Sequence, residues 1–161
     1  MGRIRLMQAK LHRVTVTETH RDYMGSVTID FSLMDKVGIL PLQEVQIVNV
    51  TNGNRVTTYP VPGEPGSGIV CINGAAANLF TPGDIVLIFT FEERERADVM
   101  KYGHEAKVVI ADDKNRCQEF LIQTLIPKGN SAEFHSASPV SAPSNWVSGI
   151  PVSSANFLEE S

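Results

Sequence analysis

Cysteine is scarce in this sequence. Only Cys71 and Cys117 occur among 161 residues, and they do not form a C-x-x-C pair, so neither a disulfide framework nor a thiolate zinc site is indicated. The four histidines are scattered, and we therefore expect no metal site. Long hydrophobic runs are missing as well: the longest, Ile85 to Phe89, is too short to span a bilayer, and Arg3 and Arg5 stand where a signal peptide would have its apolar core. We expect a cytoplasmic protein that does not enter a membrane.

An excess of positive charge is also absent. Lys and Arg number 14 against 18 Asp and Glu, which gives a formal net charge of -4. A protein that binds nucleic acid by neutralising phosphates needs the opposite balance, so we expect no nucleic-acid partner. Hydrophobic residues make up 42% of the chain, which suits the core of one globular domain.

Serine is rare in most of the chain and common at its end. Residues 1–127 contain only Ser26, Ser32 and Ser67, whereas residues 128–161 contain nine serines and show no sustained hydrophobic periodicity. Such a segment cannot bury enough apolar surface to offset its ordering entropy alone. We therefore predict a folded domain over residues 1–127 and a flexible, Ser/Pro-rich tail over residues 128–161.

The folded domain is predicted to be rich in short strands. Alternating or continuous apolar runs indicate strands over residues 14–17, 27–29, 44–50, 54–61, 69–72, 85–91, 107–110 and 117–122. The Asn52-Gly53 dipeptide favours a tight hairpin because both residues tolerate positive φ, so Asn54 to Val61 should return antiparallel to the strand before it. Many short strands in so small a chain favour a closed barrel, which leaves no exposed strand edge.

Helices are expected to be short and few. One is predicted over Phe31–Val37, opened by Asp30 or Ser32 and ended at Gly38. A second should begin at Gly74, and a third should run over residues 93–102.

A Gly25-Ser26 pair lies between two of the predicted strands. Alone, such a dipeptide is usually a turn. The chain also carries K-L-H-R-V at Lys10–Val14, Y-x-G-S at Tyr23–Ser26, T-N-G-x-R-x-x-T-Y at Thr51–Tyr59, and N-G-A-A-A with G-D-I-V at Asn73–Val86. In this order and spacing, from about Arg3 to Phe91, the motifs resemble those of the aspartate 1-decarboxylases, a family of pyruvoyl-dependent enzymes.

The resemblance implies a fold and a reaction. The fold is a mainly β, six-stranded double-psi β-barrel with a few short helices, and the assembly is a homotetramer with sites at subunit interfaces. Self-cleavage between Gly25 and Ser26 would divide the chain into a β chain, residues 1–25, and an α chain, residues 26–161. The implied reaction is decarboxylation of L-aspartate to β-alanine and CO2, for the synthesis of pantothenate and coenzyme A.

The implied cofactor is a covalent pyruvoyl group derived from Ser26. It would form a Schiff base with aspartate and replace pyridoxal phosphate as the electron sink. The sequence has no Gly-rich phosphate loop, so we expect no pyridoxal phosphate.

The residue types around the cleavage site suit this chemistry. Gly25 is expected to permit the strained turn in which Ser26 Oγ attacks its carbonyl carbon. Thr58 is our candidate donor to the oxyanion and a candidate substrate ligand. Tyr59 carries a phenolic hydroxyl that can hold the proton that goes to the substrate. Strand alternation separates Thr58 from Tyr59, so one site can contain both only at a bulge or a strand end, which Pro60 favours.

Aspartate carries two carboxylates, which cations can bind. Arg55 can grip a carboxylate bidentately and Lys10 offers a mobile point charge, although both residue types are often plain exposed charges. A helix start with small side chains lets a carboxylate approach free N–H groups. With the roles that the resemblance adds, the expected substrate-binding residues are Lys10, Arg55, Thr58, Asn73, Gly74, Ala75 and Ala76. His12 and Tyr23 are candidates for orienting the site, and a structural role for His12 is an equal alternative.

Two features depart from the family pattern. Pro65 stands where many relatives have Arg, and the serine-rich tail is longer than usual in the family. We expect both to affect subunit packing or maturation, for which a maturation factor is a candidate partner. The alternative function is a non-catalytic double-psi barrel that binds a ligand or a protein and never matures.

Overall fold

The fold is mainly β with a few short helices, as the sequence predicts. A computed structural model describes residues 2–139, 146–147 and 150–151, so the remainder of the predicted tail lies outside the described residues. The elements in chain order are β1 (Arg3–Thr15), β2 (Glu18–His20), β3 (Ser26–Asp30), α1 (Phe31–Val37), β4 (Val45–Asn49), β5 (Arg55–Thr58), β6 (Pro60–Gly63), β7 (Val70–Asn73), the 3-10 helix η1 (Gly74–Leu79), β8 (Ile85–Glu95), α2 (Arg96–Tyr102), β9 (His104–Ala111), β10 (Cys117–Lys128), β11 (Ser131–Ala137), β12 (Trp146–Val147) and β13 (Ile150–Pro151).

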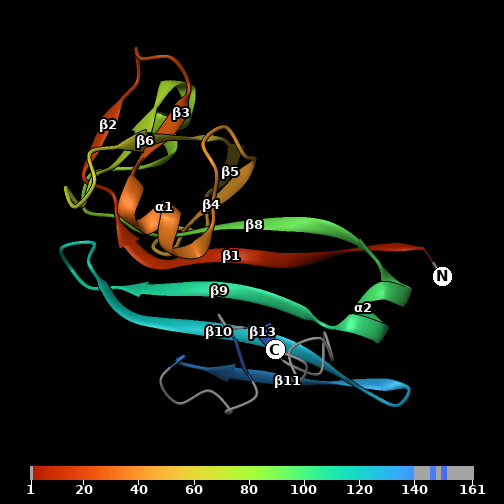
Figure 1. Cartoon of the computed structure of the whole chain (residues 1–161). Helices are drawn as coiled ribbons and strands as arrows, with labels where there is room; N and C mark the ends of the chain where they lie inside the picture. Colours follow the sequence, from red (N-terminus) through yellow and green to blue (C-terminus); the bar gives the residue numbers. More distant parts are fainter. Residues whose placement is uncertain (1, 140–145, 148–149, 152–161) are drawn as a thin grey trace.

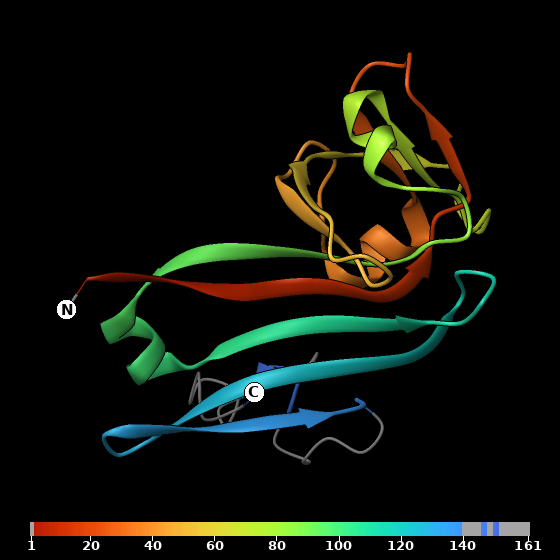
Figure 2. The ribbon, with the colours of Figure 1, turned by 180° about the vertical axis from the view of Figure 1, so that it is seen from behind.

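The strands up to β11 form two sheets. A seven-stranded sheet has the order β11-β10-β9-β1-β8-β4-β5, and a four-stranded sheet has the order β2-β7-β3-β6. In Figure 1 the long strands β1, β8, β9, β10 and β11 run beneath a lobe that contains β2 to β7 and α1, and Figure 2 shows the same two parts from behind. The hydrogen-bonded pairs among the described strands do not close into a single ring.

One hydrophobic core joins the two sheets. Leu11 and Ile88 from the large sheet, Ile29 and Ile72 from the small sheet, and Met34 from α1 are all fully buried in it. Full burial of a side chain of this size stabilises the fold by roughly 1.5–3 kcal/mol. The core therefore holds β3 and β7 firmly, and these two strands carry the residues discussed below.

Asp30 links α1 to the loop before β7. Its side chain accepts hydrogen bonds from the backbone N–H of Ser32 at 2.8 Å, of Gly66 at 3.0 Å and of Gly68 at 2.8 Å. Burial raises the pKa of Asp30, but the hydrogen bonds from Ser32, Gly68 and Gly66 outweigh it and hold the pKa below its ordinary value. The predicted helix start at Asp30 and stop at Gly38, which has φ 81°, are both confirmed.

The predicted hairpin at residues 52–53 is confirmed, but its return strand is shorter than expected. β4 and β5 pair antiparallel, with Val45 opposite Thr58. β5 ends there, and β6 pairs parallel with β3 in the other sheet. Residues 54–61 are therefore two strands in two sheets, because proline at position 60 cannot donate to the β4 ladder. Tyr59 lies at the crossing point.

The ordered sheet extends beyond residue 127, where the tail was predicted to begin. β10 continues to Lys128, and β11 returns antiparallel to it over Ser131–Ala137. The connecting turn contains Gly129 at φ 61°, and a Gly-Asn turn of this kind suits a tight hairpin. Strand β11 is mostly exposed, so it lacks the apolar periodicity on which the prediction relied.

Two other elements differ in length from their predictions. β1 begins at Arg3, well before the predicted strand start at residue 14, and pairs along its length with β8. The predicted third helix begins only at Arg96, because Glu93 and Glu95 continue β8 and lie 3.4 and 3.1 Å from the guanidinium of Arg3. No helix in the described ranges is both long and apolar enough to cross a membrane.

Candidate active site

The Gly25–Ser26 peptide lies where the loop after β2 enters β3. Ser26 is the first residue of β3, is only 6% exposed, and has φ 143°. A non-glycine residue in this region of positive φ carries strain of about 1–3 kcal/mol. Gly25 is not among the positive-φ glycines, and a Cβ on it would meet nothing within 4 Å. The positive φ at this peptide therefore belongs to Ser26 and not to Gly25, the residue that was expected to permit the strained turn.

Tyr59 provides the hydrogen-bond donor to this peptide. Its hydroxyl donates to the carbonyl oxygen of Gly25 at 2.9 Å. Its own carbonyl accepts from the backbone N–H of Val27 at 3.0 Å, which fixes Tyr59 beside β3. Thr58, the donor expected from the sequence, ends β5 and makes no side-chain hydrogen bond within the described residues. The change of sheet after Thr58 brings Tyr59, rather than Thr58, to the Gly25 carbonyl.

Asn73 connects Ser26 to its neighbours on the small sheet. Antiparallel pairing of β3 and β7 sets Asn73 opposite Ser26. Its side-chain amide donates to Ser26 Oγ at 3.4 Å and to Thr28 Oγ1 at 3.1 Å. The Cys71 thiol in turn donates to Asn73 Oδ1 at 3.3 Å. These contacts orient the amide toward Ser26.

Cys71 is a neighbour of the site that sequence reasoning missed. It is 4% exposed on β7, and burial, followed by the negative charge of Glu18, raises the pKa of its thiol. The thiol is therefore protonated at neutral pH and able to donate to Asn73. Its position two residues before Asn73 on a strand was the available signal, because such residues share a face.

The backbone at Gly74 packs directly against the cleavage site. Gly74 has φ 71°, and a Cβ on it would lie 2.7 Å from Gly25 Cα and 3.0 Å from Gly25 N. Only glycine allows this approach without displacing the peptide. Ala75 is exposed and Ala76 half-buried at the start of η1, so the predicted helix start is present as one short 3-10 helix.

The two expected cations are not part of this cluster in the single chain. Lys10 is half-buried on β1 and makes no hydrogen bond or ion pair within the described residues. Arg55 lies on β5 and donates to the Gln46 side chain at 3.1 Å. Strands β8 and β4 separate β1 from β5 in the sheet. The pKa of His12 is lowered by its burial and then by the charges of Lys10 and Arg13, so its imidazole is neutral at pH 7.

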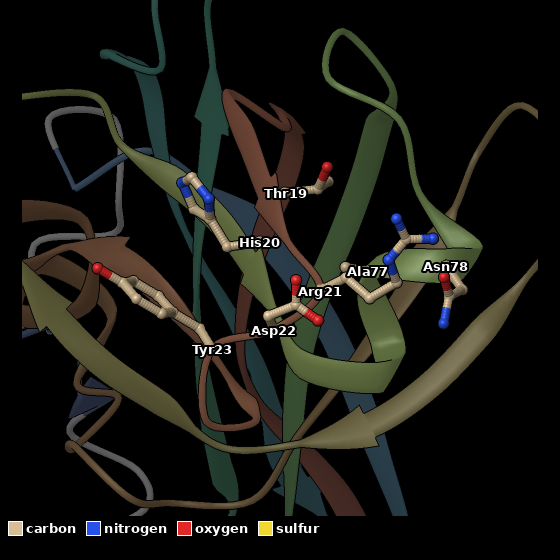
Figure 3. A pocket seen from close by; sticks show the side chains of 7 residues that line it. All are labelled: Thr19, His20, Arg21, Asp22, Tyr23, Ala77 and Asn78. Atoms are coloured by element: carbon tan, nitrogen blue, oxygen red, sulfur yellow. The ribbon is translucent and has the colours of Figure 1, made fainter.

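A cavity of about 540 Å³ borders the loop that leads to the cleavage site. It is lined by Thr19, His20, Arg21, Asp22, Tyr23, Ala77 and Asn78, and Figure 3 shows these side chains. His20 and Tyr23 pack against each other with ring centroids 5.3 Å apart. Tyr23, which was expected to orient the site, lines this cavity and is 68% exposed. Ser26, Tyr59 and Asn73 do not line the cavity.

The arrangement suits an acyl shift within the backbone. A strained, buried serine follows a carbonyl that already accepts a hydrogen bond from a tyrosine hydroxyl. Such a donor stabilises the oxyanion that forms when a hydroxyl attacks the carbonyl carbon. The residues around Ser26 are therefore suited to cleavage of the Gly25–Ser26 peptide bond, which would make residue 26 the N-terminus of a new chain.

The chain is similar to known proteins over most of its length. A family model described as aspartate decarboxylase matches residues 2–118. The aspartate 1-decarboxylase of Crocosphaera subtropica is 57% identical over 142 residues, which cover 87% of this chain and 94% of the relative. That of Bacillus subtilis is 47% identical over 116 residues, which cover 72% and 90%. Among solved structures, the rationally designed mkDPBB_sym1 protein is 23% identical, with a TM-score of 0.35, over 53% of this chain and 96% of that chain.

Proposed function

Since the chain belongs to the aspartate decarboxylase family, we propose that it decarboxylates L-aspartate to β-alanine on a pyruvoyl group made from its own Ser26. The activity is that of a carboxy-lyase, and CO2 is the second product. β-Alanine would serve the synthesis of pantothenate, and thereby of coenzyme A, in the cytoplasm. A purely ligand-binding barrel is not favoured, because curated relatives with close to half or more of their residues in common carry the name of the enzyme.

One observation carries the proposal of self-cleavage. The Tyr59 hydroxyl lies 2.9 Å from the Gly25 carbonyl oxygen, next to a serine held at φ 143°. Attack by Ser26 Oγ forms a bond to the Gly25 carbonyl carbon and breaks the Gly25–Ser26 C–N bond, so that an ester replaces the amide. The hydroxyl proton goes to the released Ser26 nitrogen. Tyr59 stabilises the oxyanion between these steps, and loss of such a donor costs on the order of 10²- to 10³-fold in rate.

Two further steps complete the new chain start. Removal of the Ser26 Cα proton expels the Gly25 carboxylate from Cβ, and water then replaces the nitrogen of the resulting dehydroalanine, which leaves as ammonia. Asn73, which donates to Ser26 Oγ at 3.4 Å, is suited to holding that oxygen in place for the first attack. Residues 1–25 become a separate chain that stays in the seven-stranded sheet through β1 and in the four-stranded sheet through β2.

A pyruvoyl group at this position would supply an electron-withdrawing carbonyl, which would take up the electron pair of the Cα–carboxylate bond when that carboxylate leaves aspartate as CO2. The chain's own residues bind and protonate the substrate. Tyr59 loses its peptide acceptor when Gly25 becomes a chain end, and its hydroxyl can then deliver a proton to the substrate Cα. Residues 74–76 have small side chains or none, so a substrate carboxylate can approach their backbone closely.

Lys10 and Arg55 are proposed to bind the carboxylates of an aspartate that occupies the site of a neighbouring subunit. Neither makes a hydrogen bond to Ser26 or Tyr59 in the described chain, and Lys10, which is half-buried without a hydrogen-bond or ion-pair partner, is suited to completing a site across an interface. This is in line with a homotetramer whose sites lie between subunits. His12 and Tyr23 are proposed to orient these groups, and Pro65 and the tail to affect assembly or the need for a maturation factor.

The proposed reaction is tested by measuring β-alanine released from L-aspartate. The wild-type chain should be active and should lose activity after borohydride reduces its ketone. Ser26→Ala should be inactive, whereas Ser67→Ala, a change on an exposed loop, should keep wild-type activity. β-Alanine production by Ser26→Ala at the wild-type rate would refute the mechanism.

The shared site is tested with two inactive variants. Lys10→Ala and Tyr59→Phe each damage one half of the proposed site. When the two variants are co-expressed, mixed oligomers should recover part of the activity. Some of their sites then contain an intact Lys10 from one subunit and an intact Tyr59 from the other. Mixed oligomers that remain inactive would show that both residues act within one subunit.

A further inference from the structure

The edge of the four-stranded sheet carries a polar cluster beside the candidate site. Glu18 and His20 lie on β2, and Cys71 lies on the neighbouring strand β7. The parallel pairing sets Glu18 opposite Cys71 and His20 opposite Asn73. Residues two apart on a strand share a face, so the three side chains meet on one side of the sheet.

The ligand atoms of these side chains are close together. The Glu18 carboxylate, the His20 imidazole and the Cys71 sulfur all lie within 4.8 Å of one another. His20 Nε2 already lies 2.9 Å from Glu18 Oε1. Within the described part of the chain, no other group of three His, Cys, Asp or Glu residues gathers in this way. From this geometry we propose that Glu18, His20 and Cys71 form a binding site for a zinc-class divalent ion.

The donor set determines the class of ion. A thiolate, an imidazole and a carboxylate together suit Zn²⁺ and its close relatives Co²⁺ and Ni²⁺, whereas Mg²⁺ and Ca²⁺ prefer oxygen ligands alone. Bonds of about 2.0–2.3 Å in a tetrahedral site put ligand atoms roughly 3.3–3.8 Å apart. Closing the remaining distance requires a movement of about 1 Å, which the half-exposed side chains of Glu18 and His20 can supply.

The site leaves one coordination position open. β2 is an edge strand, with β7 as its partner in the sheet. The side chains of Glu18 and His20 are 50% and 48% exposed, so an ion can enter from solvent and keep a water as its fourth ligand. Three protein ligands and one open position are typical of accessible rather than purely structural zinc sites.

Binding would change the hydrogen bonds that lead to Ser26. The Cys71 S–H bond breaks, a sulfur–metal bond forms, and the proton passes to solvent. Asn73 Oδ1 then loses the thiol donor that lies 3.3 Å away, while Asn73 Nδ2 still faces Ser26 Oγ. The ion site is therefore one residue removed from the cleavage site.

No metal site was expected from the sequence. Cys71 is 53 and 51 positions away from Glu18 and His20 along the chain, and no spacing rule connects residues so distant. The parallel register of β2 and β7 brings them together.

The test is titration of the chelator-treated full-length chain with Co²⁺, followed by competition with Zn²⁺. A thiolate-to-cobalt charge-transfer band should appear in the wild-type chain and be absent from Cys71→Ser. Loss of a group that only hydrogen-bonds to a metal ligand lowers the metal affinity by about 10- to 100-fold. Loss of a ligand itself should therefore lower the affinity by at least about 100-fold. His20→Gln, a change at a half-exposed residue that spares the core, should weaken binding similarly.

Two control variants match these changes. Cys117→Ser removes the other free cysteine, which is exposed. His135→Gln removes the imidazole of a second His–Glu pair on an exposed strand, 3.8 Å from Glu133. Both should bind Co²⁺ as the wild-type chain does. A wild-type chain without the charge-transfer band, or one whose affinity is unchanged by Cys71→Ser and His20→Gln, would overturn the proposal.

Discussion

Replacement of Gly74 by alanine should slow self-cleavage. The new Cβ would lie 2.7 Å from Gly25 Cα, whereas ordinary contact begins at 3.4 Å, so the cleavage-site backbone must move by about 0.7 Å. A misplacement of about 1 Å at a reacting centre can cost about 10²-fold in rate. We therefore expect Gly74→Ala to cleave on the order of 10- to 100-fold more slowly than the wild-type chain.

The matched control for this prediction is Gly38→Ala. Gly38 has φ 81°, close to the 71° of Gly74, but a Cβ on it would meet nothing within 4 Å. Both variants bear the cost of an alanine at positive φ, about 1–2 kcal/mol, and only Gly74→Ala disturbs the peptide at Gly25. A time course of fragment release, followed by gel and mass spectrometry, separates the two effects. Cleavage of Gly74→Ala at the wild-type rate, or equal slowing of both variants, would refute the reasoning.

Four further substitutions test other residues at or near the site. Tyr59→Phe should slow cleavage on the order of 10²- to 10³-fold, and Thr58→Val should slow it less. Equal cleavage half-lives for the two variants would argue against Tyr59 as the donor. Asn73→Ala should slow the attack by Ser26, and an unchanged rate of fragment release would remove Asn73 from that step. Asp30→Asn should lower the free energy of unfolding by about 1–3 kcal/mol. Folding lowers the pKa of Asp30, so the ionised carboxylate contributes its full share to the free energy of unfolding above pH 3.8, the ordinary pKa of the group. This share is lost as the pH falls through the lower pKa of the folded chain. Urea titrations of the wild-type and Asp30→Asn chains should therefore show their free energies of unfolding converging at low pH.

Local signals in the sequence predicted much of the fold. The α1 helix starts at Asp30 and stops at Gly38 because a side-chain cap and a left-handed glycine are local features. The hairpin at Asn52-Gly53 could likewise be predicted, because the turn residues that favour it are adjacent in the sequence. The extension of β1 back to Arg3 was missed, because it is stabilised by pairing with β8, a strand some 80 to 90 positions later in the chain.

The candidate site was predicted in part. Gly25, Ser26, Tyr59 and Asn73 do meet, because the motifs around them are carried by β3, β7 and the junction after β5. The choice of Tyr59 over Thr58 as donor to the Gly25 carbonyl depends on the change of sheet at Tyr59. Strand alternation describes a single sheet, so it could not predict which of two neighbouring residues faces the other sheet.

Positions that depend on register or on assembly could not be predicted. Cys71 meets Glu18 through the parallel register of two strands far apart in the sequence. Lys10 and Arg55 carry the charges that the substrate requires, yet in the single chain they lie on strands of the large sheet, whereas Ser26 lies in the small sheet, and neither makes a hydrogen bond to Ser26. Their contribution depends on how subunits associate, which local patterns in one chain do not encode.

The mass spectrum of the purified wild-type chain after incubation shows whether the chain cleaves itself at Gly25–Ser26. Self-cleavage should give two species, residues 1–25 and residues 26–161, with the larger one lacking a free amino group at its start and reacting with hydrazine. Ser26→Ala should give a single species of the full 161 residues. An intact wild-type chain that still decarboxylates L-aspartate would contradict the account.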